Sequence, residues 1–179
     1  MEKVSKERKE RVMEKVRKAG DPENYETEWD EEGRFKSKEK VKVKRGRASK
    51  GAGARFELRV RRDLEEKGRI VDKWSNNVDA KEWKLIIARK IFNPFKKFMV
   101  PSAGFPDFIS IKQIHDWAYS VIGVEVKMNG NLSKIEKQKC AWYLQNKVFS
   151  EIWIARKGEK RGVVEYDDFS EKYGEKYNN

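Results

Sequence analysis

The chain has 179 residues, a hydrophobic fraction of 37% and a formal net charge of +12 at neutral pH. A chain of this length can bury one core of ordinary size, so we expect one domain plus an arm. The excess of Lys and Arg favours a polyanionic partner, nucleic acid first, with a membrane surface as the weaker alternative.

The sequence also predicts the absence of a membrane span, a secretory signal and a disulfide. No apolar run reaches the roughly 18 residues of a membrane span, and the N-terminus is charged where a secretory signal would be apolar. Cys140 is the single cysteine, which excludes an internal disulfide and a cysteine-based zinc site. We therefore expect an intracellular, cytoplasmic protein with one small buried thiol.

Residues 1–50 form the expected charged arm. A helix is predicted over residues 2–19, ended by Gly20, Asp21 and Pro22. Residues 21–32 then contain acidic but no basic side chains, and residues 34–50 are strongly basic. Two interpretations stay open: a solvated, partly disordered arm whose blocks attract each other, or a basic strap that follows a DNA backbone.

The domain is expected to span residues 51–179. Phe56, Val60 and Leu64 recur every four residues, which predicts a helix over 54–67 that packs on a sheet. Glu57 lies beside this stripe, where it could reach a metal, although a salt bridge to Arg61 is the alternative. Candidate phosphate contacts along the basic stretches are Lys44, Arg45, Arg47, Lys50, Arg55 and Lys134.

The next segment predicts strands over residues 69–76 and 84–90, with a polar turn at 75–77. A basic aromatic segment follows that contains Phe92, Phe95 and Phe98. As a loop before the central strands it could stack on unpaired bases, although such side chains more often belong to a core or a dimer interface.

Two apolar runs, residues 105–111 and 121–126, form the predicted centre of the domain, joined by a polar connector at 112–119. If they pair as an antiparallel hairpin with 111 opposite 121, Asp107 lies directly across from Glu125. Opposed residues of such a pair have Cβ atoms roughly 4.5–5.5 Å apart.

Two carboxylates at that separation repel each other unless a cation lies between them. Mg²⁺ uses one or two carboxylates and keeps several waters. Lys127 projects to the same face as Glu125 because strand side chains alternate. This arrangement outlines a one-metal hydrolytic site suited to phosphodiesters; the alternative is a strand-end Asp and an ordinary surface Glu/Lys pair.

The remainder of the chain predicts a helix over residues 134–147, opened by the Ser133/Glu136 capping box. Gln138 shares a face with Ile135, Ala141 and Trp142, so it is polar on an apolar stripe. A scissile phosphate or a water could satisfy its amide, as could the backbone of the core. Strands at 151–156 and 163–166 and a short polar helix from 167 complete the predicted elements.

Pro106-Asp107 followed by Glu125-Val126-Lys127 resembles the PD-(D/E)XK nuclease superfamily. Residues 50–57 look similar to the start of archaeal Holliday junction resolvases. Gly104 to Asp107, Glu125 to Lys127 and Leu132-Ser133 before Gln138 look similar to virus-type replication-repair (VRR-NUC) nuclease domains. The segment between Asn77 and Asp107 is longer than a compact resolvase needs, and the arm is additional.

The resemblance implies an α/β fold with a restriction-endonuclease-like core, in which helices flank a central mixed β-sheet. It further implies a Mg²⁺-dependent DNA endonuclease, with Mn²⁺ as a substitute metal. Asp107, Glu125, the Val126 carbonyl and Glu57 would hold the metal. Lys127 would orient or help deprotonate the attacking water, and Gln138 would hold the phosphate or that water.

The expected substrate is branched DNA, cut by a homodimer with structure selectivity. The proposed dimer patch draws on Phe92, Phe95, Phe98, Trp142 and Phe149. One alternative is a VRR-NUC-like flap or single-strand nuclease of a virus or mobile element. Another is a basic DNA-binding protein that keeps the fold without catalysis.

Overall fold

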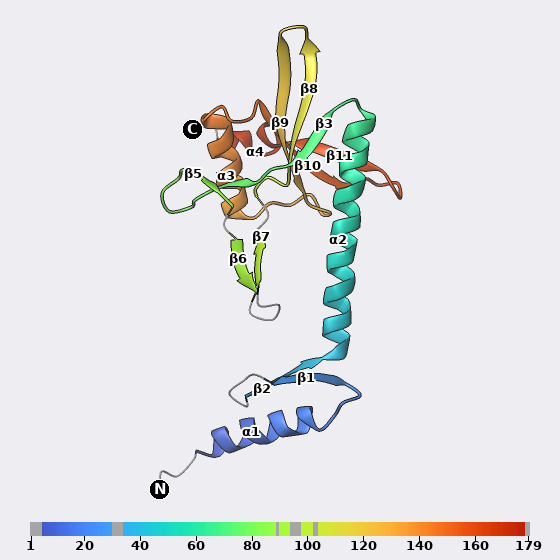
Figure 1. The fold of residues 1–179 in the computed structure, drawn as a ribbon, viewed down its shortest axis with the longest axis vertical. Helices are drawn as coiled ribbons and strands as arrows, with labels where there is room; N and C mark the ends of the chain where they lie inside the picture. Colours follow the sequence, from blue (N-terminus) through green and yellow to red (C-terminus); the bar gives the residue numbers. More distant parts are fainter. Residues whose placement is uncertain (1–4, 30–33, 89, 94–97, 102–103, 178–179) are drawn as a thin grey trace. The chain divides into compact units, whose positions relative to one another are not determined.

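The structure is a computed structural model that describes residues 5–29, 34–88, 90–93, 98–101 and 104–177. The chain divides into two compact units, residues 1–54 and 55–179, which are described separately below. Helix α2 (Lys40–Glu66) begins in the first unit and ends in the second (Figure 1).

The first unit contains α1 (Lys6–Ala19), β1 (Tyr25–Trp29), β2 (Phe35–Glu39) and the beginning of α2. Helix α1 begins after the N-cap Ser5, whose side chain accepts from the Arg8 N–H, and it ends at Gly20 as predicted. Strands β1 and β2 pair in antiparallel fashion, with Glu26 opposite Lys38. The acidic block therefore pairs with the start of the basic block, which favours mutual attraction of the two blocks.

The predicted arm differs from the observed one in its second half. The basic block is neither an extended strap nor an unstructured segment, because residues 35–39 form β2 and α2 begins at Lys40. The helix predicted over 54–67 is thus correct at its end but begins fourteen residues too late. Lys, Arg and Ala between 40 and 53 are strong helix formers, which offsets the cost of roughly 1 kcal/mol for each glycine.

The second unit is built on a five-stranded sheet in the order β11-β10-β9-β8-β3. All neighbouring pairs are antiparallel except β9 and β10, which run parallel. The strands and the helix that joins the parallel pair are β3 (Ile70–Lys73), β8 (Phe108–His115), β9 (Ala118–Val126), α3 (Lys134–Gln145), β10 (Glu151–Lys157) and β11 (Val164–Asp168). A mixed sheet flanked by helices confirms the predicted α/β class.

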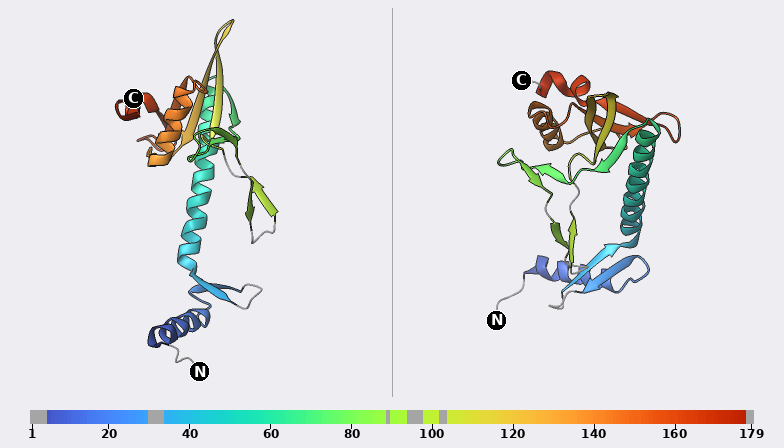
Figure 2. Two further views of the ribbon diagram at one scale, coloured as in Figure 1. Left: turned by 90° about the vertical axis from the view of Figure 1, so that its left-hand side faces the viewer. Right: turned by 45° about the horizontal axis from the view of Figure 1, so that its top comes forward.

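Each face of the sheet has its own core. Phe56, Val60 and Leu64 of α2 are buried against one face with Ile122 and Val124 of β9. On the other face lie α3 and α4 (Phe169–Tyr177), which lie side by side (Figure 2). Buried residues there include Cys140, Tyr143, Phe149, Ile152, Ile154 and Phe169. The thiol of Cys140 is fully buried, as predicted.

The segment between β3 and β8 departs from the prediction. It holds two small hairpins, β4 (Asn76–Val78) with β5 (Leu85–Ile87) and β6 (Lys90–Asn93) with β7 (Phe98–Pro101). The polar turn predicted at 75–77 is wrong, since Asn76 and Asn77 pair with residues of β5. The turn lies further on, where the Asp79 N–H donates to the Lys84 carbonyl.

The basic aromatic segment is also more regular than a loop, because β6 and β7 pair within it. Phe95 lies outside the described residues, and the side chains of Phe92 and Phe98 are not described. Their roles in base stacking or dimer formation therefore stay predictions.

The connector predicted at 112–119 is wrong, because β8 and β9 continue through it as far as His115 and Ala118. Its side chains are mostly exposed, Ile114 and Tyr119 included, because the β8–β9 hairpin projects beyond the rest of the sheet (Figure 1). Its end is exposed, and Trp117 has 83% of its surface accessible.

Two further predictions about α3 need correction. Ile135 is 53% exposed, so the predicted stripe is wrong at its first position, whereas Ala141 is buried and Trp142 packs against the core. Cys140 and Tyr143 are the other buried residues of this helix. Phe149 is buried with Tyr143 in the core, and Trp142 packs against the same cluster, so neither supplies a free dimer patch. No helix in the described part of the chain has the length and apolar character to cross a membrane.

Candidate active site

The hairpin register confirms the predicted encounter of Asp107 with Glu125. Ile111 pairs with Val121 and Ile109 with Gly123, so Asp107, just before β8, lies opposite Glu125. The Asp107 N–H donates to Glu125 Oε2 at 3.2 Å. In return, the Val126 N–H donates to Asp107 Oδ2 at 2.9 Å. The two carboxyl groups are thus held together by the backbone of both strands.

Glycine determines how closely the chain approaches this point. A Cβ on Gly104 would lie 1.9 Å from the carbonyl oxygen of Trp74, a separation that real atoms do not reach. Without that Cβ, the Phe105 N–H can donate to Asn76 and the Trp74 N–H to the carbonyl of Asp107. The position of Asp107 therefore depends on Gly104.

Lys127 lies beside the acidic pair and contacts one of its two carboxyl groups, that of Glu125. Its Nζ lies 2.9 Å from Glu125 Oε1 and 2.7 Å from Glu136 Oε1. Glu136 also forms the predicted capping box, in which its side chain accepts from the Ser133 N–H. The sequence analysis identified Glu136 only as a cap. Only a short link separates Lys127 from α3, and this short distance along the chain indicates that the first turn of the helix lies near the lysine.

The two carboxyl groups of the pair have perturbed titration. Glu125 is 4% exposed, and burial, reinforced by the charge of Asp107, raises its pKa to about 8 despite Lys127. Burial also raises the pKa of Asp107, with the charge of Glu57 acting in the same direction and the Val126 N–H opposing it. Glu125 is the more buried acid, so it retains its proton at neutral pH in the absence of a cation.

The electrostatics of Lys127 bear on its predicted action on the attacking water. Burial lowers the pKa of this amine, but hydrogen bonds to Glu136 and Glu125 and their charges outweigh burial and raise it. Lys127 is therefore charged at neutral pH. Orientation of the water by this positive charge is compatible with the geometry, and help in deprotonating the water stays a prediction.

Glu57 lies near the pair but is engaged elsewhere. Its Oε2 is 2.7 Å from Lys73 Nζ, while its alternative partner Arg61 pairs with Glu65 and donates to the Val71 carbonyl. The charge of Glu57 contributes to the raised pKa of Asp107, which places the two carboxylates within electrostatic range. The structure does not bring Glu57 into the same hydrogen-bonded group.

The donor set suits a hard divalent cation with few protein ligands. Among the described residues no group of three or more His, Cys, Asp or Glu side chains could hold a metal. Two opposed carboxylates are enough for Mg²⁺, which keeps several waters. The Val126 carbonyl is a further candidate: within a strand it points to the same side as its own N–H, which is the side of Asp107.

The structure does not bring the remaining predicted residues into the hydrogen-bonded group of Asp107, Glu125 and Lys127. Gln138 is half-buried on α3, and within the described residues its amide makes no hydrogen bond to Asp107, Glu125 or Lys127. Lys134 is exposed at the first position of α3. The predicted phosphate contacts on α2 are all exposed: Lys44, Arg45, Arg47 and Lys50 in the first unit and Arg55 in the second. The Arg47 guanidinium lies 3.7 Å from Glu26 Oε2.

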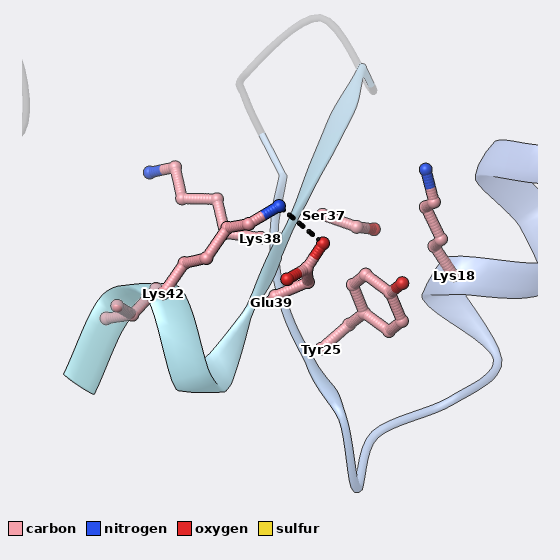
Figure 3. A pocket seen from close by; sticks show the side chains of 7 residues that line it. Lys18, Tyr25, Ser37, Lys38, Glu39 and Lys42 are labelled. Carbon is pink, nitrogen blue, oxygen red and sulfur yellow. Dashed lines mark hydrogen bonds and ion pairs between the residues drawn. The ribbon is translucent and has the colours of Figure 1, made fainter. Parts of the chain in front are cut away.

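A separate cavity of about 500 Å³ lies within the first unit, and Figure 3 shows its lining side chains. Lys42 bonds to Glu39 at 2.7 Å, and Lys18 and Lys38 pair with Glu14 and Glu28. Since the lysines of this cavity are paired with neighbouring carboxylates, the cavity has no excess of positive charge that would attract an anionic ligand.

Comparison of the chain with models of known families, with curated proteins and with solved structures finds no match.

Proposed function

We propose that the protein is a Mg²⁺-dependent DNA endonuclease that hydrolyses phosphodiester bonds at the Asp107/Glu125 pair. The observation that supports this proposal best is the buried acidic pair with Lys127 beside it. Burial raises the pKa values of both opposed acids, so this strand end disfavours their ionised forms, and a bound cation would offset that cost. The surrounding chain is strongly basic, which suits a polyanionic substrate.

Asp107 and Glu125 would hold the Mg²⁺, with the Val126 carbonyl as a third oxygen. Bound there, the metal supplies charge neutralisation for the phosphate and lowers the pKa of water. Glu125 must lose its proton first, and Lys127 assists because its positive charge favours the carboxylate.

The residues of the chain would then act on the phosphate and on the water. Lys127 presents a permanent positive charge that can orient the attacking water or stabilise charge on phosphate oxygens. Glu136 holds the Lys127 amine in place from the helix side. Gln138 would hold the phosphate or the water, and Glu57 would complete the metal shell only after release from Lys73.

Within this function we favour structure-selective cutting of branched DNA, in the manner expected of a Holliday junction resolvase. Two symmetric cuts require two equivalent sites, which a two-fold homodimer provides. A flap or single-strand nuclease of the VRR-NUC type is the alternative and needs only one site.

A cleavage panel separates these substrates. Four-way junction, flap, single strand and linear duplex are each incubated with the protein in Mg²⁺ or EDTA. Paired incisions near the junction centre, with light scattering at twice the 21.2 kDa chain mass, support the resolvase-like proposal. A monomer that nicks flaps or single-strand ends without junction preference supports the flap nuclease.

A non-catalytic DNA-binding protein on the same fold is the alternative from another class. The contact between Lys127 and Glu125 favours it, since the lysine places a positive charge beside the acidic pair without any metal. The discriminating measurement is calorimetric titration with Mg²⁺ in the absence of DNA. Binding that is lost in Asp107→Asn supports the nuclease, and absence of binding supports the alternative.

A further inference from the structure

A small cavity on the second unit gathers positive charge away from the acidic pair. It has a volume of about 240 Å³ and lies where the turn between β10 and β11 meets α2 (Figure 1). Its lining consists of Arg59, Lys157, Gly158, Lys160, Arg161, Gly162 and Val163. Four of these seven residues are cations and none is acidic. We call this cavity the turn pocket.

The cations of the turn pocket are not neutralised by the protein. Within the described part of the chain, none of the four makes an ion pair with a carboxylate. Of the nearby acids, Glu165 pairs with Arg156, and Asp63 pairs with Lys67 and accepts from the Tyr166 hydroxyl. Glu159 is exposed in the turn itself and does not line the pocket. Four cations around one hollow repel each other, so an anion that enters it is favoured.

A neighbouring cavity differs from the turn pocket in its charge. It shares Arg59, Gly162 and Val163 with the turn pocket and is also lined by Arg62, Asp63, Glu66 and Val164. Its two arginines are balanced by two acids, whereas the charged residues that line the turn pocket are all cations. An anion is therefore favoured in the turn pocket over the neighbouring cavity.

The turn pocket and the acidic pair lie at the same end of the sheet. Strands β9 and β10 run parallel, and Val126 pairs with Ala155. The Lys127 N–H donates to the Ala155 carbonyl, and the Lys157 N–H donates to the Met128 carbonyl at 3.4 Å. Lys157, at the end of β10, therefore lies beside the residues that come directly after Glu125 in the chain.

The two features open on opposite faces of this sheet end. Val124 and Ala155 belong to the core under α2, so Lys157 shares the α2 face, whereas Glu125 alternates to the face of α3. A strand that reaches from one to the other must cross the ends of β9 and β10. Neighbouring strands of a sheet are only about 5 Å apart.

We propose that the turn pocket binds a backbone phosphate of the DNA strand, next to the phosphate at the Asp107/Glu125 pair. This inference rests on the proposed function for its choice of DNA. The pocket holds the flanking backbone across the sheet end and so contributes affinity and register, while the acidic pair performs the chemistry. It carries no base contacts and adds no sequence preference.

The test measures DNA binding as a function of salt in EDTA, so that cleavage plays no part. The probe is a fluorescein-labelled duplex, and the variant is Lys160→Gln/Arg161→Gln, both exposed positions. The matched control is Lys147→Gln/Lys176→Gln, which removes the same charge from exposed positions outside the pocket. Each lost phosphate contact flattens the plot of log affinity against log salt by about 0.9.

The expected slope of the pocket variant is shallower than that of the wild type by about 0.9, for one phosphate, and the control keeps the wild-type slope. The affinity ratio of wild type to variant then shrinks roughly 3.5-fold between 50 and 200 mM salt. Equal slopes for pocket variant and control overturn the proposal. Saturable calorimetric binding of inorganic phosphate that is lost in the variant, with unchanged DNA slopes, also overturns it in favour of a small-anion site.

The outcome is independent of the proposed catalysis. A shallower slope for the pocket variant, without any Mg²⁺-dependent cleavage by the wild type, supports the phosphate-binding role of the turn pocket and refutes the nuclease function. Cleavage by the wild type with unchanged slopes sustains the nuclease and removes the pocket.

Discussion

Glu125 provides a sharp test because its titration is coupled to folding. Burial and the charge of Asp107 raise its pKa from the ordinary 4.5 to about 8, and unfolding returns it to the ordinary value. Between these two values the folded state holds a proton that the unfolded state has lost. The free energy of unfolding therefore falls as the pH rises. This contribution is fully present below pH 4.5 and is lost as the pH rises through about 8.

The magnitude follows from proton linkage. One proton held only by the folded state gives a limiting slope of about 1.4 kcal/mol per pH unit. Glu125→Gln preserves the shape of the side chain but cannot titrate. The free energy of unfolding of the variant minus that of the wild type should therefore grow with pH between 5 and 8. Its total increase is expected to be a few kcal/mol, while groups that titrate in both proteins cancel.

The assay is urea unfolding at pH 5, 6, 7 and 8 in EDTA, followed by tryptophan fluorescence. Glu175→Gln, an exposed position of α4, is the matched control and should follow the wild type. Added Mg²⁺ should stabilise the wild type most at pH 8, because a ligating carboxylate must be deprotonated, and should leave Glu125→Gln unchanged. Parallel profiles for Glu125→Gln and wild type across this range would refute the account of the buried pair.

Three further predictions concern the scaffold, the lysine and the first unit. Gly104→Ala should lower the free energy of unfolding by more than about 1 kcal/mol, because its Cβ meets the Trp74 carbonyl; Gly53→Ala, with open space and a helical backbone, should raise it by up to about 1 kcal/mol in the same urea titration. Lys127→Met should slow cleavage at least about 100-fold while Mg²⁺ still binds in calorimetry, and a collapse of metal affinity would make the lysine structural. Replacement of Lys44, Arg45 and Lys50 by Gln should flatten the salt dependence of duplex binding by up to about 2.7, whereas an unchanged slope would show that these residues stay solvated.

The centre of the domain was predictable because its sequence carries strong local constraints. Alternating apolar residues allow one register for β8 and β9, since a slip by one residue would expose the buried side chains. Ser133 and Glu136 likewise determine where α3 begins. The hairpin register and the alternation of side chains along the strand are enough to predict that Asp107, Glu125 and Lys127 lie at the same end of the sheet.

Other features depend on information that no short pattern contains. The first half of α2 contains no buried residue, so its sequence has no apolar period to mark a helix. The pairing of Lys127 with Glu136 and of Glu57 with Lys73 depends on how separate elements pack. The predicted face of α3 includes the buried Ala141 but is wrong at Ile135, which is apolar yet exposed at the first turn. The turn pocket arises from residues far apart in the sequence that meet only after folding.

Nicking of supercoiled plasmid DNA tests the central claim most directly, with wild type, Asp107→Asn and Glu125→Gln purified in parallel. We predict that the wild type nicks the plasmid in Mg²⁺ but not in EDTA. Both variants should bind the plasmid at least as tightly as the wild type, because each removes a negative charge near the phosphates, and neither should cut it. Cleavage by either variant at the wild-type rate, or wild-type cleavage that persists in EDTA, would contradict the assignment of the Asp107/Glu125 pair as a metal-dependent nuclease site.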